Sequence, residues 1–581
     1  MTAVVRAYPG EPLGPVSRRL FGHFGEHIDR VVYGGLWAEL LVNRKFELPG
    51  LQGRLEPVAP GWHLVGDARP RRGTSHLLEL GRDAHHQQIV AFAGNETCPS
   101  GIAQRGVVLD AGTVYKVSVE CSTRGATGPL RFALADASGS VLSSAVVALA
   151  EDAGDWHPVF PLRGVVAEAV LESPLTTDDG MLSLTVDPAG AAELWLHWVS
   201  LLPEGAIDGL HPAIVDVFRE LPANLVKYPG GCFADNYDWR LGVGPRHDRH
   251  GAPDTAWGGW DENDFGTDEF LRWCELTNTE PYLCVNHGSG TPELAAAWVD
   301  YCNGPASSRW GRRRAEHGHP EPYAVGLWAI GNEVYGPWER GASDAASYAK
   351  SVRAFADAMR SVDPSIRIVA QGDLGDYSAD VLRRASEVIS YLSVHHYASP
   401  SAAPIDDDEA YVAAGRDFEN RLRPLVEQIR RTRGAEHVRL ALDEWGWVDA
   451  DRGNCAAAFA ASVLAACVRL APYVEIGALC CLVNPGGAVQ RIGEQITLTP
   501  AHSVMRAFND AYLPTAVRTE AAGEIDACAF TDGYDVTVVL SNATRARQQV
   551  ALEVGSETRR LELGPFQVMT CMISGGCRTL A

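Results

Sequence analysis

Val325-Gly326-Leu327-Trp328-Ala329-Ile330-Gly331-Asn332-Glu333 is the stretch that decides the fold of this chain. Its apolar run has the length of one buried β-strand and ends in a polar Gly-Asn-Glu turn. An amphipathic helix is predicted over residues 343–362, and another apolar run follows at 366–370. A strand, a crossover helix and a second buried strand make up the repeating unit of a parallel sheet.

The same alternation of strand and helix extends from about residue 210 to residue 485. A further helix is predicted at 267–277, and further buried strands are predicted at 225–228, 281–285, 389–394 and 438–442. The apolar stretch 456–483 is interrupted by charged residues and a proline before it reaches the ~20 residues of a membrane span, so we interpret it as a buried helix followed by a buried strand. A βα series of this length predicts a parallel sheet, either open or closed into a (β/α)8 TIM barrel.

Two other regions have the texture of antiparallel β-structure. Residues 56–203 contain short alternating runs separated by turn residues, which is typical of a β-sandwich. Residues 491–581 contain an apolar strand after the Asp532-Gly533 hairpin signal. We therefore predict an α/β fold with these parts: a barrel formed by 19–55 and 204–490, an inserted β-sandwich resembling a carbohydrate-binding module at 56–203, a C-terminal β-sandwich at 491–581, and an N-terminal segment, 1–18, that joins the C-terminal β-domain.

The composition of the chain excludes several classes of protein. Of 581 residues, 46% are hydrophobic and 21% are charged, which excludes a disordered or collagen-like chain. The net charge of −23 repels phosphate backbones and anionic lipid, so we expect no nucleic-acid partner and no membrane partner. The first residues lack a basic stretch followed by an apolar core, and the thirteen cysteines show no CxxC pair. We therefore expect a cytoplasmic protein with reduced thiols.

Two predicted strands end in a glutamate beside aromatic residues. One glutamate is Glu333, and the other is Glu444 in Leu442-Asp443-Glu444-Trp445. In a barrel the carboxyl ends of all strands lie on one face, so the two side chains can face each other across it. A pair of carboxyl groups flanking a glycosidic bond is what retaining glycoside hydrolysis requires. The alternative is that each glutamate is a solvated loop residue or a structural ion-pair partner.

An ordered set of motifs carries a family resemblance. The stretch from Trp328 to Trp338 resembles the acid/base motif, and Leu442 to Trp445 the nucleophile motif, of the α-L-arabinofuranosidases of glycoside hydrolase family fifty-one in clan A. Further stretches match in the same order: Gly22-His23-Phe24-Gly25-Glu26-His27, Tyr33-Gly34-Gly35, Tyr228-Pro229-Gly230-Gly231-Cys232-Phe233, Gly242-Val243-Gly244-Pro245, 291–303, Ser393-Val394-His395-His396-Tyr397 and Leu482-Val483-Asn484.

The resemblance implies exo-acting release of a terminal furanosyl residue from an oligosaccharide or glycoside with retained configuration. Glu444 would be the nucleophile and Glu333 the general acid and base, with their carboxyl groups ~5 Å apart. Asn332 would hydrogen-bond the sugar 2-hydroxyl, and Glu26 and Tyr397 would line the same pocket. Trp338, with Trp257 and Trp260, could stack on sugar faces. The family implies a homo-oligomer, often a hexamer, and two carboxylates need neither metal nor cofactor.

Three residues depart from the family pattern and bear on substrate choice. Lys227 stands where the family usually has Arg, although the chain has only four lysines among its 50 basic residues. Cys481 stands where many members have a sugar-binding Gln, and Cys232 where some have Asn. Lys cannot form the planar two-point contact of Arg. The preferred sugar is therefore open: α-L-arabinofuranoside, or a galactofuranoside, a D-arabinofuranoside or a pyranoside.

Other interpretations remain open at this point. His23 to His27 fits an HxxEH zinc motif, but that motif needs a helix and its glycines disfavour one. In the pair His395-His396 we expect one ring to face the pocket and the other to pack. A non-catalytic carbohydrate-binding protein is the alternative of a different class. We expect the tryptophans of the sandwich to be core residues rather than ligand platforms: Trp62, Trp156, Trp195 and Trp198.

Overall fold

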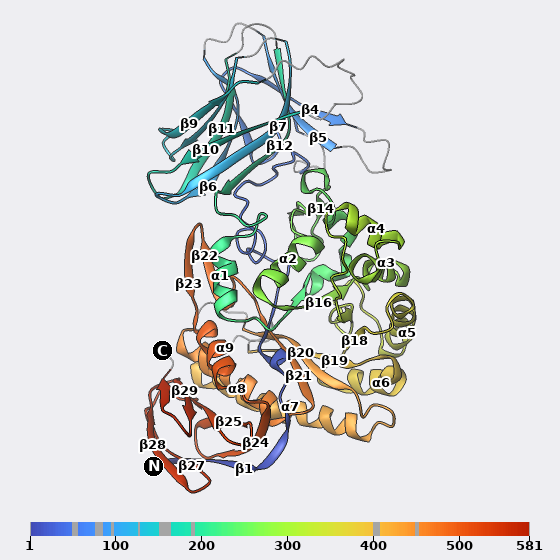
Figure 1. Ribbon diagram of the computed structural model, residues 1–581, viewed down its shortest axis with the longest axis vertical. Coiled ribbons are helices and arrows are strands. Elements are labelled where there is room, and N and C mark those ends of the chain that lie inside the picture. The colour runs from blue at the N-terminus through green and yellow to red at the C-terminus, as the bar shows by residue number, and fades with distance from the viewer. Residues whose placement is uncertain are drawn as a thin grey trace.

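The computed structural model shows three parts stacked along the long axis of the molecule (Figure 1). A β-sandwich lies at one end, a helix-covered barrel lies in the middle, and a β-domain that carries both chain termini lies at the other end. The structure describes these residues: 2–48, 56–75, 85–93, 98–125, 128–149, 164–187, 192–398, 407–447 and 452–579.

Eight parallel strands close into the barrel. In the order in which they are paired, they are β13 (Leu225–Tyr228), β16 (Glu280–Val285), β17 (Leu327–Ile330), β18 (Arg367–Gln371), β19 (Tyr391–Tyr397), β20 (Arg439–Gly446), β21 (Val474–Cys480) and β2 (Gly22–Phe24). The prediction of a (β/α)8 barrel is confirmed. Because the strands are covered inside and outside, they appear in the sequence as continuous apolar runs.

The predicted and observed strands differ at their carboxyl ends. We predicted a strand at 389–394, whereas β19 continues to Tyr397. The strand predicted to end at residue 442 continues through Glu444 to Gly446. His395, Tyr397 and Glu444 therefore lie on strands, where the two-residue alternation fixes the side of the barrel wall to which each side chain points.

Helices cover the outside of the barrel. They are α1 (Pro212–Glu220), α2 (Thr267–Thr277), α3 (Pro292–Asn303), α4 (Arg309–Glu316), α5 (Ala345–Val362), α6 (Asp376–Ala385), α7 (Asp408–Arg431), α8 (Asn454–Arg469) and α9 (Pro500–Ala511). Helix α5 begins at an Asp344 cap, whose carboxylate accepts the N–H groups of Ala346 and Ser347. Its buried residues recur every three or four positions, as an amphipathic helix requires: Tyr348, Ala349, Val352, Phe355, Ala356 and Met359.

Helix α8 is buried on all sides. Every residue from Cys455 to Val468 is buried, because the helix lies between the barrel, helices α7 and α9, and the C-terminal strands. The buried helix and strand predicted within 456–483 are thus confirmed as α8 and β21. Among the described residues, no helix is long and apolar enough to cross a membrane.

The inserted sandwich follows the first barrel strand, β2, and precedes α1. One five-stranded sheet has the order β10 (Val165–Glu172), β7 (Val114–Arg124), β12 (Ala192–Pro203), β5 (His85–Phe92), β4 (Arg69–Ser75). The other has the order β3 (Trp62–Val65), β6 (Ser100–Leu109), β11 (Thr177–Val186), β8 (Leu130–Ala135), β9 (Val141–Val147). The inserted β-sandwich is confirmed.

The tryptophans of the sandwich differ in their surroundings. Trp62 is buried in the sandwich core, as expected. Trp198 instead stacks on His247 of the barrel at a centroid distance of 3.6 Å, so it joins the two domains. Trp195 is partly buried, and Trp156 lies outside the described residues.

The C-terminal domain, which we predicted as a β-sandwich, is built from one continuous sheet. Its strand order is β28 (Glu557–Leu563), β27 (Gln548–Val554), β1 (Ala3–Pro15), β24 (Thr515–Ala521), β25 (Ile525–Thr531), β26 (Val536–Asn542), β29 (Val568–Met572), β30 (Cys577–Thr579). Strands from opposite ends of this order, β28 and β29, contribute to one hydrophobic core, so the sheet curls around it. The N-terminal strand β1 pairs with β24 and β27 in the middle of the sheet. A short hairpin, β22 (Val489–Ile492) and β23 (Gln495–Leu498), precedes the domain.

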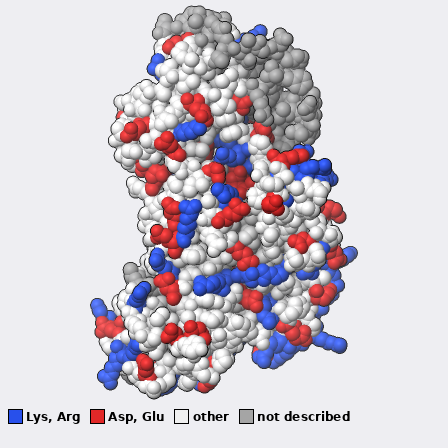
Figure 2. All heavy atoms as spheres, viewed as in Figure 1, with Lys and Arg blue, Asp and Glu red and all other residues white. Residues whose placement is uncertain are grey.

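Charge and cysteine chemistry complete the description. On the face drawn in Figure 2, acidic and basic side chains are interspersed, so the net negative charge is not gathered into one patch there. Cys571 and Cys577 form a disulfide in the C-terminal sheet, which corrects the expectation that all thiols are reduced. The other eleven cysteines are free.

Candidate active site

Glu333 and Glu444 lie at the carboxyl end of the barrel, with His395 between them. Nδ1 of His395 is 2.8 Å from Oε1 of Glu333 and 3.6 Å from Oε2 of Glu444. One ligand atom from each of the three side chains lies within 4.8 Å of the others, so a carboxylate oxygen of Glu333 approaches one of Glu444 to within that distance. The two glutamates predicted to converge are therefore side by side.

Glu333 is held on both carboxylate oxygens. The hydroxyl of Tyr335 donates to Oε1 at 3.0 Å, and the indole N–H of Trp338 donates to Oε2 at 2.7 Å. Its backbone N–H donates to the Gln371 side chain at the end of β18. The φ angle of Glu333 is +38°, an uncommon conformation for a residue other than glycine, and the surrounding contacts hold it in place.

Glu444 has one oxygen held and the other without a hydrogen-bond partner. Tyr397 donates to Oε1 at 2.6 Å. Oε2 is buried and accepts no hydrogen bond from the described residues. An ionised oxygen with no donor on it keeps its lone pairs for an electrophile, which is the arrangement a nucleophile needs.

Lys227 is a fully buried cation behind this pair. Its Nζ donates to Oδ1 of Asn332 at 3.1 Å and lies 3.4 Å from Oδ2 of Asp443 and 3.9 Å from Oε2 of Glu444. Burial by itself would lower the pKa of Lys227, but the charges of Asp443 and Glu444 raise it above its usual range. The lysine is therefore charged at neutral pH.

Asp443 anchors this cation from the barrel interior. Its carboxylate accepts the hydroxyl of Tyr282 at 2.6 Å and that of Ser393 at 2.5 Å. Burial favours the neutral acid, but the nearby Lys227 ammonium and a hydrogen bond from His395 hold the pKa of Asp443 well below its usual range. Asp443 is thus an ionised, fully bonded support rather than a reacting group.

Glu26, Asn332 and Glu444 converge on one point in front of Gly231. A Cβ atom placed on Gly231 would stand 3.2 Å from Oε2 of Glu444 and 3.3 Å from both Nδ2 of Asn332 and Oε1 of Glu26. The polar ends of these three side chains therefore meet at one point. Oε1 of Glu26 accepts the backbone N–H of Phe233 at 2.9 Å.

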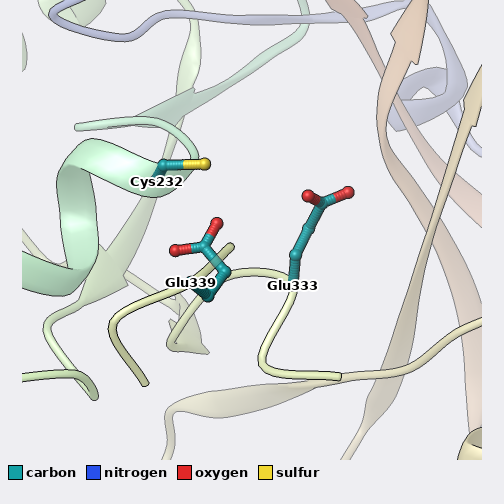
Figure 3. A group of neighbouring side chains, drawn as sticks. All are labelled: Cys232, Glu333 and Glu339. Carbon is teal, nitrogen blue, oxygen red and sulfur yellow. The ribbon is translucent and has the colours of Figure 1, made fainter. Parts of the chain in front are cut away.

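Cys232, Glu333 and Glu339 form a second group beside this point (Figure 3). Cys232 begins a short 3-10 turn, and its thiol bonds to Glu339, which also accepts Nδ2 of Asn332 at 3.1 Å. One ligand atom from each of the three lies within 4.8 Å of the others, as in the group of Glu333, His395 and Glu444. Both groups contain Glu333, so a cation held there would compete with the acid and base role predicted for this carboxylate.

Cys481 lies beside Cys480 at the end of β21, and their sulfurs are 3.0 Å apart. Glu26 and Glu444 are among the charges that act on the Cys481 thiol, which places it at the same pocket. Trp257 hydrogen-bonds Glu26. Trp260 lies next to a cavity of about 230 Å³ that is also lined by Tyr33 and Asp254.

The structure places the histidines of the two sequence motifs in different surroundings. His23 lies in strand β2 with its ring against Phe218, and His27 stacks on Phe233, so the helix that the zinc motif needs is absent and that interpretation is wrong. Of the pair at the end of β19, His395 faces the pocket while His396 stacks on Phe418, as expected.

Burial and neighbouring groups shift the pKa values of Glu333, Glu444 and His395 in different directions. Burial favours a high pKa for Glu333, but the hydrogen bonds from His395, Trp338 and Tyr335 outweigh it and lower that pKa. Burial raises the pKa of Glu444 against the charges of His395 and Lys227. Burial also acts against the charged form of His395, yet the surrounding carboxylates raise its pKa to about 10. At neutral pH the proton therefore resides on His395, next to Glu333.

Several site residues were not identified from the sequence: Tyr335, Glu339, Gln371 and Asp443. One of them, Gln371, had a usable signal. Gln371 stands at the carboxyl end of a predicted strand, where barrel sites are built.

Parts of the chain are similar in sequence to known proteins. Residues 217–416 match the domain model described as the α-L-arabinofuranosidase 1 domain. α-L-Arabinofuranosidase C of Emericella nidulans is 41% identical over 224 residues, which are 38% of this chain and 44% of that protein. The intracellular exo-α-(1→5)-L-arabinofuranosidase 1 of Bacillus subtilis is 34% identical over 254 residues, 42% of this chain and 50% of that protein. The matches thus span about half the length of these relatives.

Solved structures share the fold over the whole chain. An arabinose-bound family 51 α-L-arabinofuranosidase matches with a TM-score of 0.77 at 16% identity, covering 100% of both chains. The arabinose complex of the α-L-arabinofuranosidase from Thermotoga maritima matches with a TM-score of 0.63 at 20% identity, covering 100% of this chain and 98% of that one. The chain is thus similar in sequence to α-L-arabinofuranosidases over residues 217–416, and as a whole it shares the fold of the glycoside hydrolase family 51 structures.

Proposed function

We propose that the protein is a retaining, exo-acting α-L-arabinofuranosidase that releases a terminal arabinofuranosyl residue from oligosaccharides or glycosides. The observation that carries this proposal is the approach of Glu333 and Glu444 to within 4.8 Å at the mouth of the barrel. Retaining enzymes place their carboxyl groups ~5–5.5 Å apart, whereas inverting enzymes separate them by ~6.5–9.5 Å to admit a water. The separation of Glu333 and Glu444 is therefore that of a site in which a carboxylate attacks the sugar directly, without an intervening water.

The proposed reaction has two displacements. Oε2 of Glu444 attacks the anomeric carbon while Glu333 gives a proton to the departing oxygen, so an ester of Glu444 forms and the aglycone leaves. Glu333 then takes a proton from water, the water oxygen attacks the anomeric carbon, and the Glu444 carboxylate is released.

We propose that His395 holds the proton that Glu333 delivers. Of the groups that raise the pKa of His395, the Glu444 carboxylate has the largest effect. When Glu444 becomes an ester it loses its charge, so His395 becomes more acidic as the leaving group needs its proton. As the ester forms, the proton moves along the 2.8 Å hydrogen bond to Glu333 while Glu333 protonates the departing oxygen, and it returns to His395 when the Glu444 carboxylate is released.

The sugar contacts proposed for the other residues come from the family resemblance, and the geometry is compatible with them. Asn332 would donate its second N–H to the 2-hydroxyl, since the first is taken by Glu339. Glu26, Tyr397, Cys232 and Cys481 would line the pocket, and Trp338 is 63% exposed at its entrance. The name of the Bacillus subtilis relative supports exo action and a cytoplasmic location. A homo-oligomer and a carbohydrate-binding role for the sandwich stay proposals that rest on the family resemblance.

A panel of 4-nitrophenyl glycosides tests the proposed substrate. We expect the α-L-arabinofuranoside to have the highest kcat/KM among L- and D-pentofuranosides, a galactofuranoside and common pyranosides. The alternative is an enzyme of the same fold that prefers another sugar because of Lys227 and Cys481. A higher kcat/KM on another sugar would establish that alternative, and binding of sugars without turnover of any substrate would favour a non-catalytic carbohydrate-binding protein.

The protonation of Glu26 should make kcat/KM depend on pH. Burial and the nearby Glu444 raise the pKa of Glu26 to about 8, so it is a neutral donor at pH 7 and becomes anionic above pH 8. A second negative charge beside Glu444 weakens sugar binding, so we expect kcat/KM to fall as pH rises through about 8. Glu26→Gln stays neutral and should lack this fall, as measured by pH profiles of the two enzymes. An unchanged profile in Glu26→Gln would remove Glu26 as its source.

The raised pKa of Glu26 also makes the free energy of unfolding depend on pH. Folded Glu26 keeps its proton to about pH 8, whereas the unfolded carboxyl releases it near 4.5, so the folded state binds more protons between these values. The contribution of Glu26 to the free energy of unfolding therefore declines as pH rises across this window, and the decline is absent in Glu26→Gln. Chemical unfolding at several pH values provides this check without any substrate.

Glu339 positions Asn332, and a matched pair of variants separates this role from general damage. Glu339→Ala leaves the Asn332 amide without its acceptor, and hydrogen bonds to charged groups contribute ~1.5–3 kcal/mol. We expect kcat/KM to fall about 10- to 100-fold. Glu339→Gln keeps an oxygen acceptor and should lose less.

A 2-deoxy glycoside provides the control for Glu339. This substrate lacks the hydroxyl that Asn332 would bind, so the Glu339→Ala defect should largely disappear on it. A defect of equal size on the 2-hydroxy and 2-deoxy substrates would show that Glu339 does not act through Asn332.

A further inference from the structure

Cys480 and Cys481 form an adjacent pair of free thiols whose sulfurs are 3.0 Å apart. Cys480 ends strand β21 and is partly exposed, whereas Cys481 is 3% exposed and packs against Phe24 and Ala478. The proposed reaction uses neither sulfur. A sulfur–sulfur separation this short brings the two atoms within reach of a bond.

The pair is connected to the proposed nucleophile. Tyr397 hydrogen-bonds the Cys480 sulfur and donates its hydroxyl to Oε1 of Glu444 at 2.6 Å. Glu26 and Glu444 act electrostatically on the Cys481 thiol. A change of bonding between the sulfurs would therefore reach Glu444 through a single side chain.

We propose that Cys480 and Cys481 are a reversible oxidation site, at which a hydroperoxide converts the dithiol into a disulfide between adjacent residues and thereby inactivates the enzyme. The effect on activity rests on the proposed function, whereas the modification itself does not.

The chemistry takes place in two balanced steps. The partly exposed Cys480 sulfur attacks the outer oxygen of the hydroperoxide, which gives a sulfenic acid and releases the alcohol. The Cys481 sulfur then displaces water from the sulfenic acid and the S–S bond forms. Two thiols lose two hydrogens in total, and the hydroperoxide is reduced.

The bond should be easily reversed. Consecutive Cα atoms are at most ~3.8 Å apart, which is below the ~4.4–6.8 Å typical of disulfides. A disulfide outside the usual range stores strain and is reduced more readily, which is the behaviour of labile, regulatory disulfides rather than structural ones. Formation withdraws the Cys480 sulfur from Tyr397 and so disturbs the hydrogen bond on Glu444.

The test treats the full chain with tert-butyl hydroperoxide, alkylates the remaining thiols and maps the peptides by mass spectrometry. We expect the peptide containing Cys480 and Cys481 to lose the mass of two hydrogens and to escape alkylation. Turnover of the best glycoside of the panel should fall at least 10-fold and return after dithiothreitol. Cys480→Ser should no longer form this disulfide.

Controls separate the possible outcomes. Cys98 is an exposed thiol in the sandwich, so Cys98→Ser should show the same oxidation and the same inactivation as the wild type. Loss of turnover while Cys480 and Cys481 both remain open to alkylation would overturn the proposal. Disulfide formation without loss of turnover would also overturn it. The mass map of the wild type requires no variant to fold and no substrate, so its result stands even where the proposed glycosidase activity fails.

Discussion

Replacing Glu444 with Gln removes turnover on every glycoside, by on the order of 10⁴-fold or more in kcat. The amide keeps the shape of the side chain, but its lone pair is a poor nucleophile, so the glycosyl ester cannot form. Oε2 of Glu444 is buried and accepts no hydrogen bond from the part of the chain that the structure describes, so it is the oxygen proposed to attack the sugar. The measurement is kcat on the best aryl glycoside and on a natural oligosaccharide.

The variant needs a control for folding. Glu293 is an exposed glutamate in the first turn of α3, and Glu293→Gln should leave kcat unchanged. Thermal unfolding of both variants should show a cooperative transition near that of the wild type. Retention of more than about one hundredth of the wild-type kcat by Glu444→Gln would exclude the nucleophile role.

Replacing Glu333 with Ala gives a defect that depends on the leaving group. General acid catalysis contributes about 10²- to 10⁴-fold, so kcat/KM should fall by that factor on alkyl or sugar aglycones. A nitrophenolate leaves with little protonation, so its glycosides should suffer far less in the first displacement. The measurement is kcat/KM across a series of leaving groups of increasing pKa, with the wild type alongside.

The pH profile provides a second readout of the same variant. In the wild type His395 keeps its proton to about pH 10 because carboxylates surround it. Removing Glu333 takes away one of these charges, so the pKa of His395 should fall. Equal losses on good and poor leaving groups, together with an unchanged histidine titration, would remove Glu333 from the acid role.

Prediction from sequence succeeded where local pattern and burial agree. The barrel strands appear as short apolar runs because both faces of each strand are covered, and helices such as α2 keep a three-to-four residue repeat because one face is solvated. Glu333 and Glu444 could be identified as candidates because strand ends at the carboxyl face are where a barrel places its reactive groups. The remaining barrel strands followed the same two rules.

Prediction was incomplete where a residue acts through distant partners. Asp443 precedes Glu444, yet its role comes from Tyr282, Ser393 and Lys227, each on a different strand. The hydrogen bond from His395 that helps to lower the pKa of Glu333 could not be predicted, because only coordinates show that an imidazole lies next to this carboxylate.

The sequence by itself determined the βα repeat, the inserted sandwich and the two glutamates, because hydrophobic period, turn chemistry and motif order are local properties of the chain. Tertiary structure alone decided that β1 joins the last domain in one curled sheet, that the carboxylates around His395 raise its pKa, and that Cys480 hydrogen-bonds Tyr397. These features depend on contacts between residues far apart in the chain and on the loss of water around them, and neither is encoded in any short stretch of sequence.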